Sequence, residues 1–330
     1  MIREMSTLDF TPGQVARARH HTYALLGRLF VDGLNDELLP YVHAIPELVS
    51  TLPDSLDVDE AAADYQHLFC FNLFPYESIF LDTTGLLGGA ISEAVWRNYE
   101  RAGYSVNKAA TSADHIGPEL SFMAFLAGAE AEAWEDGQAA VAQQMQQQQR
   151  DFLQAHLLRW LPPLALAVRR QGQLFFTALA DLTLAFVHSH YANMGSRAAI
   201  DFRLPAPPTL LDDEKTGLKE IAAYLATPLY SGFYLSRDDV GRMGRQQRLP
   251  RGFAGRSQML LNLMRAAVQY DALPALLAEL QSLTDGWQKA YAVLAGTYPE
   301  LRPWATTWQA RANNTVHILS GITTQYGVAA

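Results

Sequence analysis

Residues 114–127 read DHIGPELSFMAFLA, and this stretch shows the pattern that sets the fold. Its larger apolar residues recur at helical spacing, at Ile116, Leu120, Met123 and Ala127. Such spacing places them on one buried stripe of a helix. Asp114 stands just before the stripe, where a carboxylate can accept hydrogen bonds from the first backbone N–H groups of a helix. We therefore predict a helix that begins after an Asp114 N-cap.

Helical spacing continues on both sides of this stretch. Thr11 and Pro12 are typical of a helix start, and Gly33 of the end of that helix. Further helices are predicted over 38–52, 58–71, 91–103, 138–160, 173–193, 213–226, 237–244, 256–270, 273–295 and 299–319. Residues 74–89 contain a proline and three glycines and predict a structured loop. No strand-like alternation occurs, so the predicted fold class is all-α.

A proline-rich segment, LPAPP at 204–208, divides the sequence. Three prolines in four residues favour an extended linker over a helix. We therefore expect a helical domain over 1–203 and a second helical unit over 209–330 that packs on it.

Composition excludes several classes of protein. The chain has 330 residues and a net charge of −9, which disfavours non-specific nucleic-acid binding and suits a basic partner. Its single cysteine, Cys70, can form no internal disulfide; it lies in an apolar run, so a buried thiol is expected. The first seven residues lack the apolar run of a secretory signal, and the apolar stretches are too short to span a bilayer. We expect a cytoplasmic protein without membrane insertion.

Three motifs follow one another along the first domain. They are Tyr65-x-x-Leu68-Phe69 with Pro75-Tyr76-Glu77-Ser78-x-Phe80, then Asp114-His115-Ile116-Gly117-x-Glu119-Leu120-x-Phe122-Met123, then Phe152-x-x-x-His156-x-x-x-Trp160-x-Pro162. Together they resemble the family of redox-enzyme maturation chaperones that includes TorD, DmsD and NarJ, over about residues 10–195. Two features depart from the family. The residues at 111–113 are Thr-Ser-Ala where the family often has Glu-Pro, and residues 204–330 exceed its common size.

The resemblance implies an all-helical chaperone that needs no cofactor and catalyses no reaction. Its implied partner is the precursor of a molybdopterin-containing oxidoreductase catalytic subunit, bound through its twin-arginine leader and often its body. The chaperone would hold this precursor until cofactor insertion and assembly are complete.

Carried over by position, the resemblance also implies a peptide-binding site. Its residues would be Asp114, His115 and Glu119, with Pro75, Tyr76 and Ser78 from the facing loop and Leu68 and Phe69 as apolar wall. A leader with an arginine pair and an apolar stretch needs an apolar groove with carboxylates nearby, so the residue types suit it. Each also has a structural alternative: Asp114 as a helix cap, His115 as a partner of the loop, and Glu119 as a tie between helix start and loop.

Two other functions stay open on the sequence. One is a helical enzyme that uses Asp114, His115 and Glu119, for example on a nucleotide. The other is a subunit bound permanently to an oxidoreductase complex. Nothing in the residues supports nucleotide binding independently, because Gly85–Gly89 lacks the lysine of a phosphate-binding loop.

Some remaining features have a functional and a structural interpretation. His188 and His190 are two residues apart on a predicted helix and should face different directions, which disfavours a metal site. Arginines gather over 237–256, either as a dock for an acidic or phosphate-bearing partner or as ion-pair partners of Asp238 and Asp239. The glutamine tract 143–149 predicts a solvated helix face.

Overall fold

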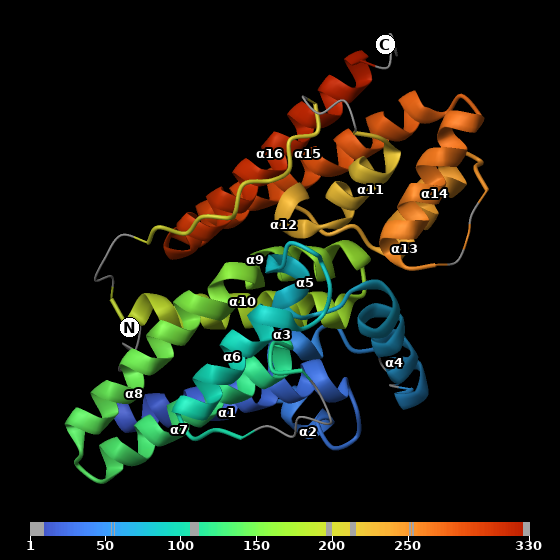
Figure 1. The fold of residues 1–330 in the computed structure, drawn as a ribbon. Helices are drawn as coiled ribbons and strands as arrows, with labels where there is room; N and C mark the ends of the chain where they lie inside the picture. Colours follow the sequence, from blue (N-terminus) through green and yellow to red (C-terminus); the bar gives the residue numbers. More distant parts are fainter. Residues whose placement is uncertain are drawn as a thin grey trace, which may run out of the picture.

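The computed structural model describes residues 10–53, 55, 57–105, 112–195, 200–211, 216–250, 252 and 254–325. In these ranges the regular structure is helical, and the β-type pairing is limited to an isolated antiparallel bridge between Tyr76 and His115. The all-α prediction is confirmed. Figure 1 shows two stacked groups of helices, an N-terminal unit below and a C-terminal unit above.

The N-terminal unit consists of helices α1 to α10 and two π-helical segments. Their bounds are α1 Pro12–Asp32, α2 Leu39–Val42, α3 Pro46–Val49, α4 Val58–Tyr65, a π-helical segment Gln66–Asn72, α5 Glu77–Leu81, α6 Gly89–Arg101, α7 Ile116–Glu135, α8 Ala139–Phe152, a second π-helical segment Leu153–Leu157, α9 Leu158–Gln171 and α10 Leu174–Asn193. Helix α1 begins as predicted: Thr11 and Gln14 cap its first turn reciprocally.

The C-terminal unit contains α11 Leu218–Ala226, α12 Pro228–Ser231, α13 Arg237–Gln246, α14 Arg256–Gln269, α15 Leu273–Thr297, a 3₁₀ turn Pro299–Leu301 and α16 Arg302–Gln325. Helices α15 and α16 form a long antiparallel pair, joined on their exposed side by Gln281 to Ser320 and Gln288 to Asn313. The shorter helices α11 to α14 lie against this pair (Figure 1).

Close contact between α1 and α7 determines the packing of the N-terminal unit. The two helices run antiparallel and approach most closely where Gly27 meets Gly117. A Cβ atom on Gly117 would lie 2.9 Å from the carbonyl oxygen of Gly27 and would overlap the side chain of Val31. The crossing therefore needs glycine on both helices.

The two units share a continuous hydrophobic core. Trp308 of α16 donates its indole N–H to the carbonyl oxygen of Arg159 at 2.8 Å, and Trp304 packs edge-to-face on Tyr191 with ring centroids 5.6 Å apart. The segment 200–211 has no helical structure and runs alongside α16 (Figure 1). Hydrogen bonds hold it there, such as that from the hydroxyl of Thr307 to the carbonyl oxygen of Phe202. Residues 204–208 have no helical structure, in agreement with their prolines, whereas the linker and the division into domains at this point stay predictions.

Several element predictions need correction. The predicted helix over 38–52 is two single-turn helices, because Pro46 starts a new turn after the extended residue Ile45. The predicted loop over 74–89 contains α5. The polar tract 143–149 is not wholly solvated, since Gln149 is fully buried. The predicted helix start at 213 and the first seven residues lie outside the described ranges.

In the part of the chain that the structure describes, no helix combines the length and the apolar composition needed to cross a membrane.

The α1–α7 crossing gives a stability prediction. Gly117→Ala should lower the free energy of unfolding by about 2 kcal/mol, because the added methyl group meets backbone that cannot move aside. Urea unfolding measures this difference. Gly296→Ala in α15 is the control: no atom lies within 4 Å of its added Cβ, so stability should stay equal or rise. Equal stability of Gly117→Ala and wild type would contradict the tight crossing.

Candidate peptide-binding site

Asp114 joins the loop before α5 to the start of α7. Its carboxylate is fully buried and accepts hydrogen bonds from the backbone N–H of Ser78 at 3.0 Å and from the hydroxyl of Ser112 at 2.5 Å. Its own carbonyl oxygen accepts from the N–H of Glu77 at 2.8 Å. Asp114 therefore satisfies the first N–H groups of α5, a helix that is distant in sequence.

The predicted Asp114 N-cap of α7 is wrong by one residue. His115 caps that helix: its Nδ1 accepts from the N–H of Gly117 at 3.1 Å. The physical reason is that the carboxylate of Asp114 is already engaged by Ser78 and Ser112 and so does not serve α7.

The loop and α7 also pair through Tyr76 and His115. These residues form the antiparallel bridge, and the N–H of Ile116 donates to the carbonyl oxygen of Pro75 at 3.0 Å. The two aromatic rings meet edge-to-face with centroids 4.8 Å apart. Burial lowers the pKa of His115 to about 4, partly offset by the nearby carboxylate of Asp114. The neutral ring this favours is the form that can accept a hydrogen bond at Nδ1.

Two further buried carboxyl groups, those of Glu119 and Glu77, lie next to Asp114. Glu119 is fully buried and accepts from the indole N–H of Trp160 at 3.3 Å. Burial raises its pKa well above the usual range, and the carboxylates of Glu77 and Asp114 and a hydrogen bond with Glu77 raise it further. Glu77 also contacts Nδ1 of His156 at 2.8 Å. These contacts tie α5, α7 and α9 together. They agree in part with the structural alternative for Glu119, which is a tie between the start of the helix and the loop.

Leu68 and Phe69 are buried in the π-helical segment. The Phe69 ring packs edge-to-face on Phe30 and on Phe176 of α10, at centroid distances of 5.8 and 5.3 Å. The expected buried thiol is contradicted: Cys70 is exposed. In this π-helical turn two consecutive residues, Leu68 and Phe69, face the core, so the next one faces solvent.

The structure therefore brings seven of the eight predicted residues into the protein interior. Pro75, Ser78, Asp114, His115 and Glu119 form one junction; Leu68 and Phe69 lie in the adjoining core. Tyr76 alone among the eight is half-buried rather than buried. In this arrangement the junction can fix the surface around it, but it exposes little area to a partner.

Open surface lies elsewhere. One hollow of about 280 Å³, which we call the α4–α10 groove, lies between α4 and the start of α10. It is lined by the carboxylates of Asp57, Glu60 and Asp64 and by apolar residues that include Leu52, Leu174 and Phe175. Phe176, on which Phe69 packs, also lines it. Phe69 therefore contacts a lining residue of this groove without lining it, and the predicted role of Leu68 and Phe69 as an apolar wall stays a prediction.

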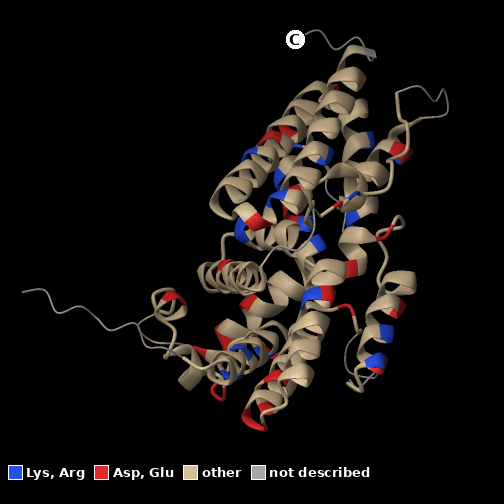
Figure 2. Ribbon diagram, turned by 90° about the vertical axis from the view of Figure 1, so that its left-hand side faces the viewer, with Lys and Arg blue, Asp and Glu red and all other residues tan. Residues whose placement is uncertain are grey.

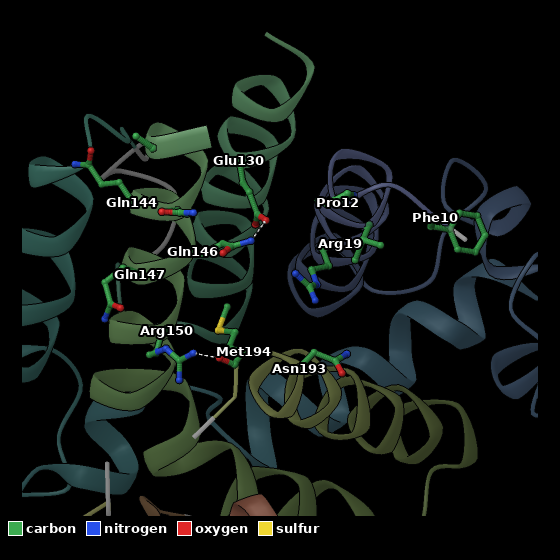
Figure 3. A pocket seen from close by; sticks show the side chains of 13 residues that line it. Phe10, Pro12, Arg19, Glu130, Gln144, Gln146, Gln147, Arg150, Asn193 and Met194 are labelled. Atoms are coloured by element: carbon green, nitrogen blue, oxygen red, sulfur yellow. Dashed lines mark hydrogen bonds between the residues drawn. The ribbon is translucent and has the colours of Figure 1, made fainter. Parts of the chain in front are cut away.

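A larger pocket of about 800 Å³, which we call the amide pocket, lies among α1, α7, α8 and α10 (Figure 3). The glutamine tract contributes four of its lining residues, Gln143, Gln144, Gln146 and Gln147. Glu130 accepts from Gln146 at 2.7 Å, and Arg150 donates to the carbonyl oxygens of Met194 and Gly195. Two arginines, Arg19 and Arg150, line the pocket, so it is unsuited to an arginine-bearing peptide.

The other motifs have structural partners. His188 contacts Glu300 at 2.5 Å, whereas His190 hydrogen-bonds Tyr23 at 2.9 Å on another face of α10. Within the described ranges, no three His, Cys, Asp or Glu side chains group as metal ligands. In the arginine-rich segment, Arg242 pairs with buried Asp239, as the ion-pair interpretation expects. Figure 2 shows basic and acidic residues interspersed over the C-terminal unit. Arg251 lies outside the described residues.

Sequence reasoning overlooked the carboxylates of α4. A signal was present: between Leu29 and Trp96 the chain has twelve Asp and Glu residues and no Lys or Arg. Because the whole chain has 34 acidic and 25 basic residues, its negative charge is concentrated in this stretch.

The N-cap gives a prediction on pH dependence. The pKa of His115 is about 4 in the folded chain and about 6.5 when unfolded, so only the unfolded chain binds this proton between those values. The free energy of unfolding should fall as pH falls through this window, by up to about 3 kcal/mol. His115→Asn keeps a cap acceptor but not the titration, and should lose this part of the pH dependence.

Urea unfolding at several pH values between about 4 and 6.5 measures this effect. His43→Asn is the control, because that side chain is exposed and should leave the wild-type pH dependence unchanged. Parallel curves for wild type and His115→Asn would count against a neutral His115 cap.

Comparison with known proteins places this architecture in a family. A protein-family model described as "Nitrate reductase delta subunit" matches residues 35–165, which contain all eight predicted site residues. Chaperone protein TorD of Vibrio cholerae is 32% identical over 179 residues, covering 52% of this chain and 79% of that protein. Chaperone protein TorD of Vibrio parahaemolyticus is 29% identical over 170 residues, covering 48% and 77%.

A further relative is similar over a shorter stretch. The perchlorate reductase assembly chaperone protein of Dechloromonas aromatica is 39% identical over 82 residues, 24% of this chain and 36% of that protein. These similarities agree with the motifs and with the all-helical fold. The chain belongs to the TorD family of chaperones.

Proposed function

We propose that this chain is a cytoplasmic chaperone for the precursor of a molybdopterin-containing oxidoreductase catalytic subunit. It binds the twin-arginine leader of that precursor, its body or both, and releases it after cofactor insertion and assembly. It acts by binding and catalyses no reaction of its own.

One observation carries the proposal, the similarity to TorD chaperones over 79% of their length. The relative named as a perchlorate reductase assembly chaperone supports an oxidoreductase as the client. The overall negative charge of −9 supports a basic element, such as an arginine pair, as the part that is recognised.

In this proposal most of the eight predicted residues act indirectly, by fixing the positions of the loop and helices around the peptide site. Asp114 and Glu119 are fully buried and hydrogen-bonded, so they fix the loop and α7 rather than offer a free carboxylate. Phe69 supports Phe176 at the α4–α10 groove. Tyr76 has the exposure needed for direct contact. In this proposal Tyr76 contacts the peptide directly and the buried residues support the site, whereas the sequence predicted direct contact for all eight.

The enzyme alternative receives less support. A catalytic acid or base must reach a substrate proton, but Asp114 and Glu119 have no exposed surface and His115 only 5%. The Nδ1 atom of His115 is also occupied by the N–H of Gly117.

Titration calorimetry tests the proposed function. The full chain is titrated with twin-arginine leader peptides, with a precursor that keeps its leader but lacks cofactor, and with the mature enzyme. We expect at least one leader and its precursor to bind with a Kd of ~1 µM or tighter, and the mature enzyme to bind much more weakly. Hydrophobic burial in the complex should give a negative heat-capacity change.

The other outcomes distinguish the alternatives. Equal affinity for precursor and mature enzyme would favour a permanent subunit. Absence of binding to every leader and precursor, together with turnover of a nucleotide that His115→Ala abolishes, would favour the enzyme.

A further inference from the structure

Helix α4 is the most exposed in its side chains among the helices of the N-terminal unit, because it has no buried residue. None of the described side chains of α4 is buried, although the helix carries Val58 and three alanines. Figure 1 shows α4 at the edge of the molecule. Only Ala61 and Tyr65 pack against the core, and the rest of this eight-residue helix faces away from it. The face that carries the exposed residues, including Glu60 and Asp64, is therefore available to a partner.

One face of α4 and its cap carries aligned carboxylates. Asp57, Glu60 and Asp64 are three and four residues apart, which places them along a single side of the helix. All three line the α4–α10 groove and are exposed. Within the described residues, none of them forms an ion pair with Lys, Arg or His. By contrast, Asp32 and Glu37 both pair with Arg28.

Apolar side chains complete the groove beside these carboxylates. Leu174 is 71% exposed at the first turn of α10, and Leu52 and Phe175 are partly exposed. Gln173 links the two sides by donating to the carboxylate of Asp64 at 3.1 Å. The Oε1 atom of Gln173 is buried and has no donor among the described residues, and a guanidinium N–H could supply one.

We infer that the α4–α10 groove binds the twin-arginine segment of the leader, an inference that rests on the proposed function. The carboxylates of Asp57, Glu60 and Asp64 receive the arginine pair, and Leu174 and its apolar neighbours receive the first apolar residues that follow it. The groove combines an apolar surface with unpaired negative charge, and the leader is its complement in both respects.

Two other hollows match the leader less well. The amide pocket is lined by Arg19 and Arg150 and by one carboxylate, Glu130, which already accepts from Gln146 and Gln149, so its net positive charge repels an arginine pair. An apolar hollow of about 430 Å³ beside α1 and α2 has Arg28 at its edge and no acidic residue in its lining. Of these three surfaces, the acidic α4–α10 groove is therefore the most complementary to the leader.

The test uses variants that remove charge and keep shape. Asp57→Asn, Glu60→Gln and Asp64→Asn are combined in one full-length protein, and the asparagine that replaces Asp57 can still cap α4. The control combines Glu93→Gln, Glu132→Gln and Asp136→Asn, three exposed acids away from the groove, with the same loss of charge. The probe is the leader peptide that binds wild type in the titration above, alongside a form with both arginines replaced by glutamine.

We expect the groove variant to bind the leader about tenfold more weakly, the effect of losing three partly exposed ion pairs, and the control to bind like wild type. The glutamine form should bind wild type and groove variant equally weakly. The wild-type affinity should fall with added salt more steeply than that of the groove variant.

A second pair of variants tests the apolar part. Leu174→Gln should weaken leader binding several-fold, whereas Val293→Gln, at a similarly exposed site on α15, should not. If wild type binds the leader and the groove variants bind it equally well, the groove assignment is wrong and the proposed function stands. If no leader binds wild type, the groove assignment fails, and the proposed function fails with it if the precursor does not bind either.

Discussion

The architecture around the motifs depends on one buried carboxylate. Asp114 is inaccessible to water, yet it accepts hydrogen bonds from Ser78 and Ser112 and so joins two segments 36 residues apart in sequence. Removing a partner from such a buried group leaves an unsatisfied N–H at substantial cost in free energy. The position of α5 relative to α7 therefore follows from this side chain. The Tyr76–His115 bridge strengthens the same junction, Glu77 links it to His156 in the second π-helical segment, and Glu119 links it to Trp160 in α9.

The helical fold could be predicted because apolar spacing records it directly. Ile116, Leu120 and Met123 are fully buried on α7, as their spacing indicated. The motifs also identified residues that lie together: the loop at Pro75 and the turn at Asp114 are adjacent in space. The predicted burial of Cys70 was wrong for a local reason. A π-helical turn directs the side chain of Cys70 to solvent, and the α-helical spacing of 3.6 residues per turn cannot predict such a turn.

The roles of the site residues could not be derived from residue type alone. An Asp before a helix usually caps that helix, but here the carboxylate is taken by the distant N–H of Ser78 and by the hydroxyl of neighbouring Ser112. Burial is likewise a property of the whole fold, so sequence could not show that Glu119 is enclosed by α5 and α9. The acidic stretch from Leu29 to Trp96 was legible in the sequence, but only the structure shows that its carboxylates on α4 face an apolar groove.

Hydrogen–deuterium exchange of the full chain, with and without a twin-arginine leader peptide, tests the central claim most directly, because it reports where binding slows the opening of backbone hydrogen bonds. The account predicts slower exchange in α4 and in the first turn of α10, and unchanged exchange in α8 beside the amide pocket. Protection confined to α8 or to the C-terminal unit, with none in α4, would contradict it.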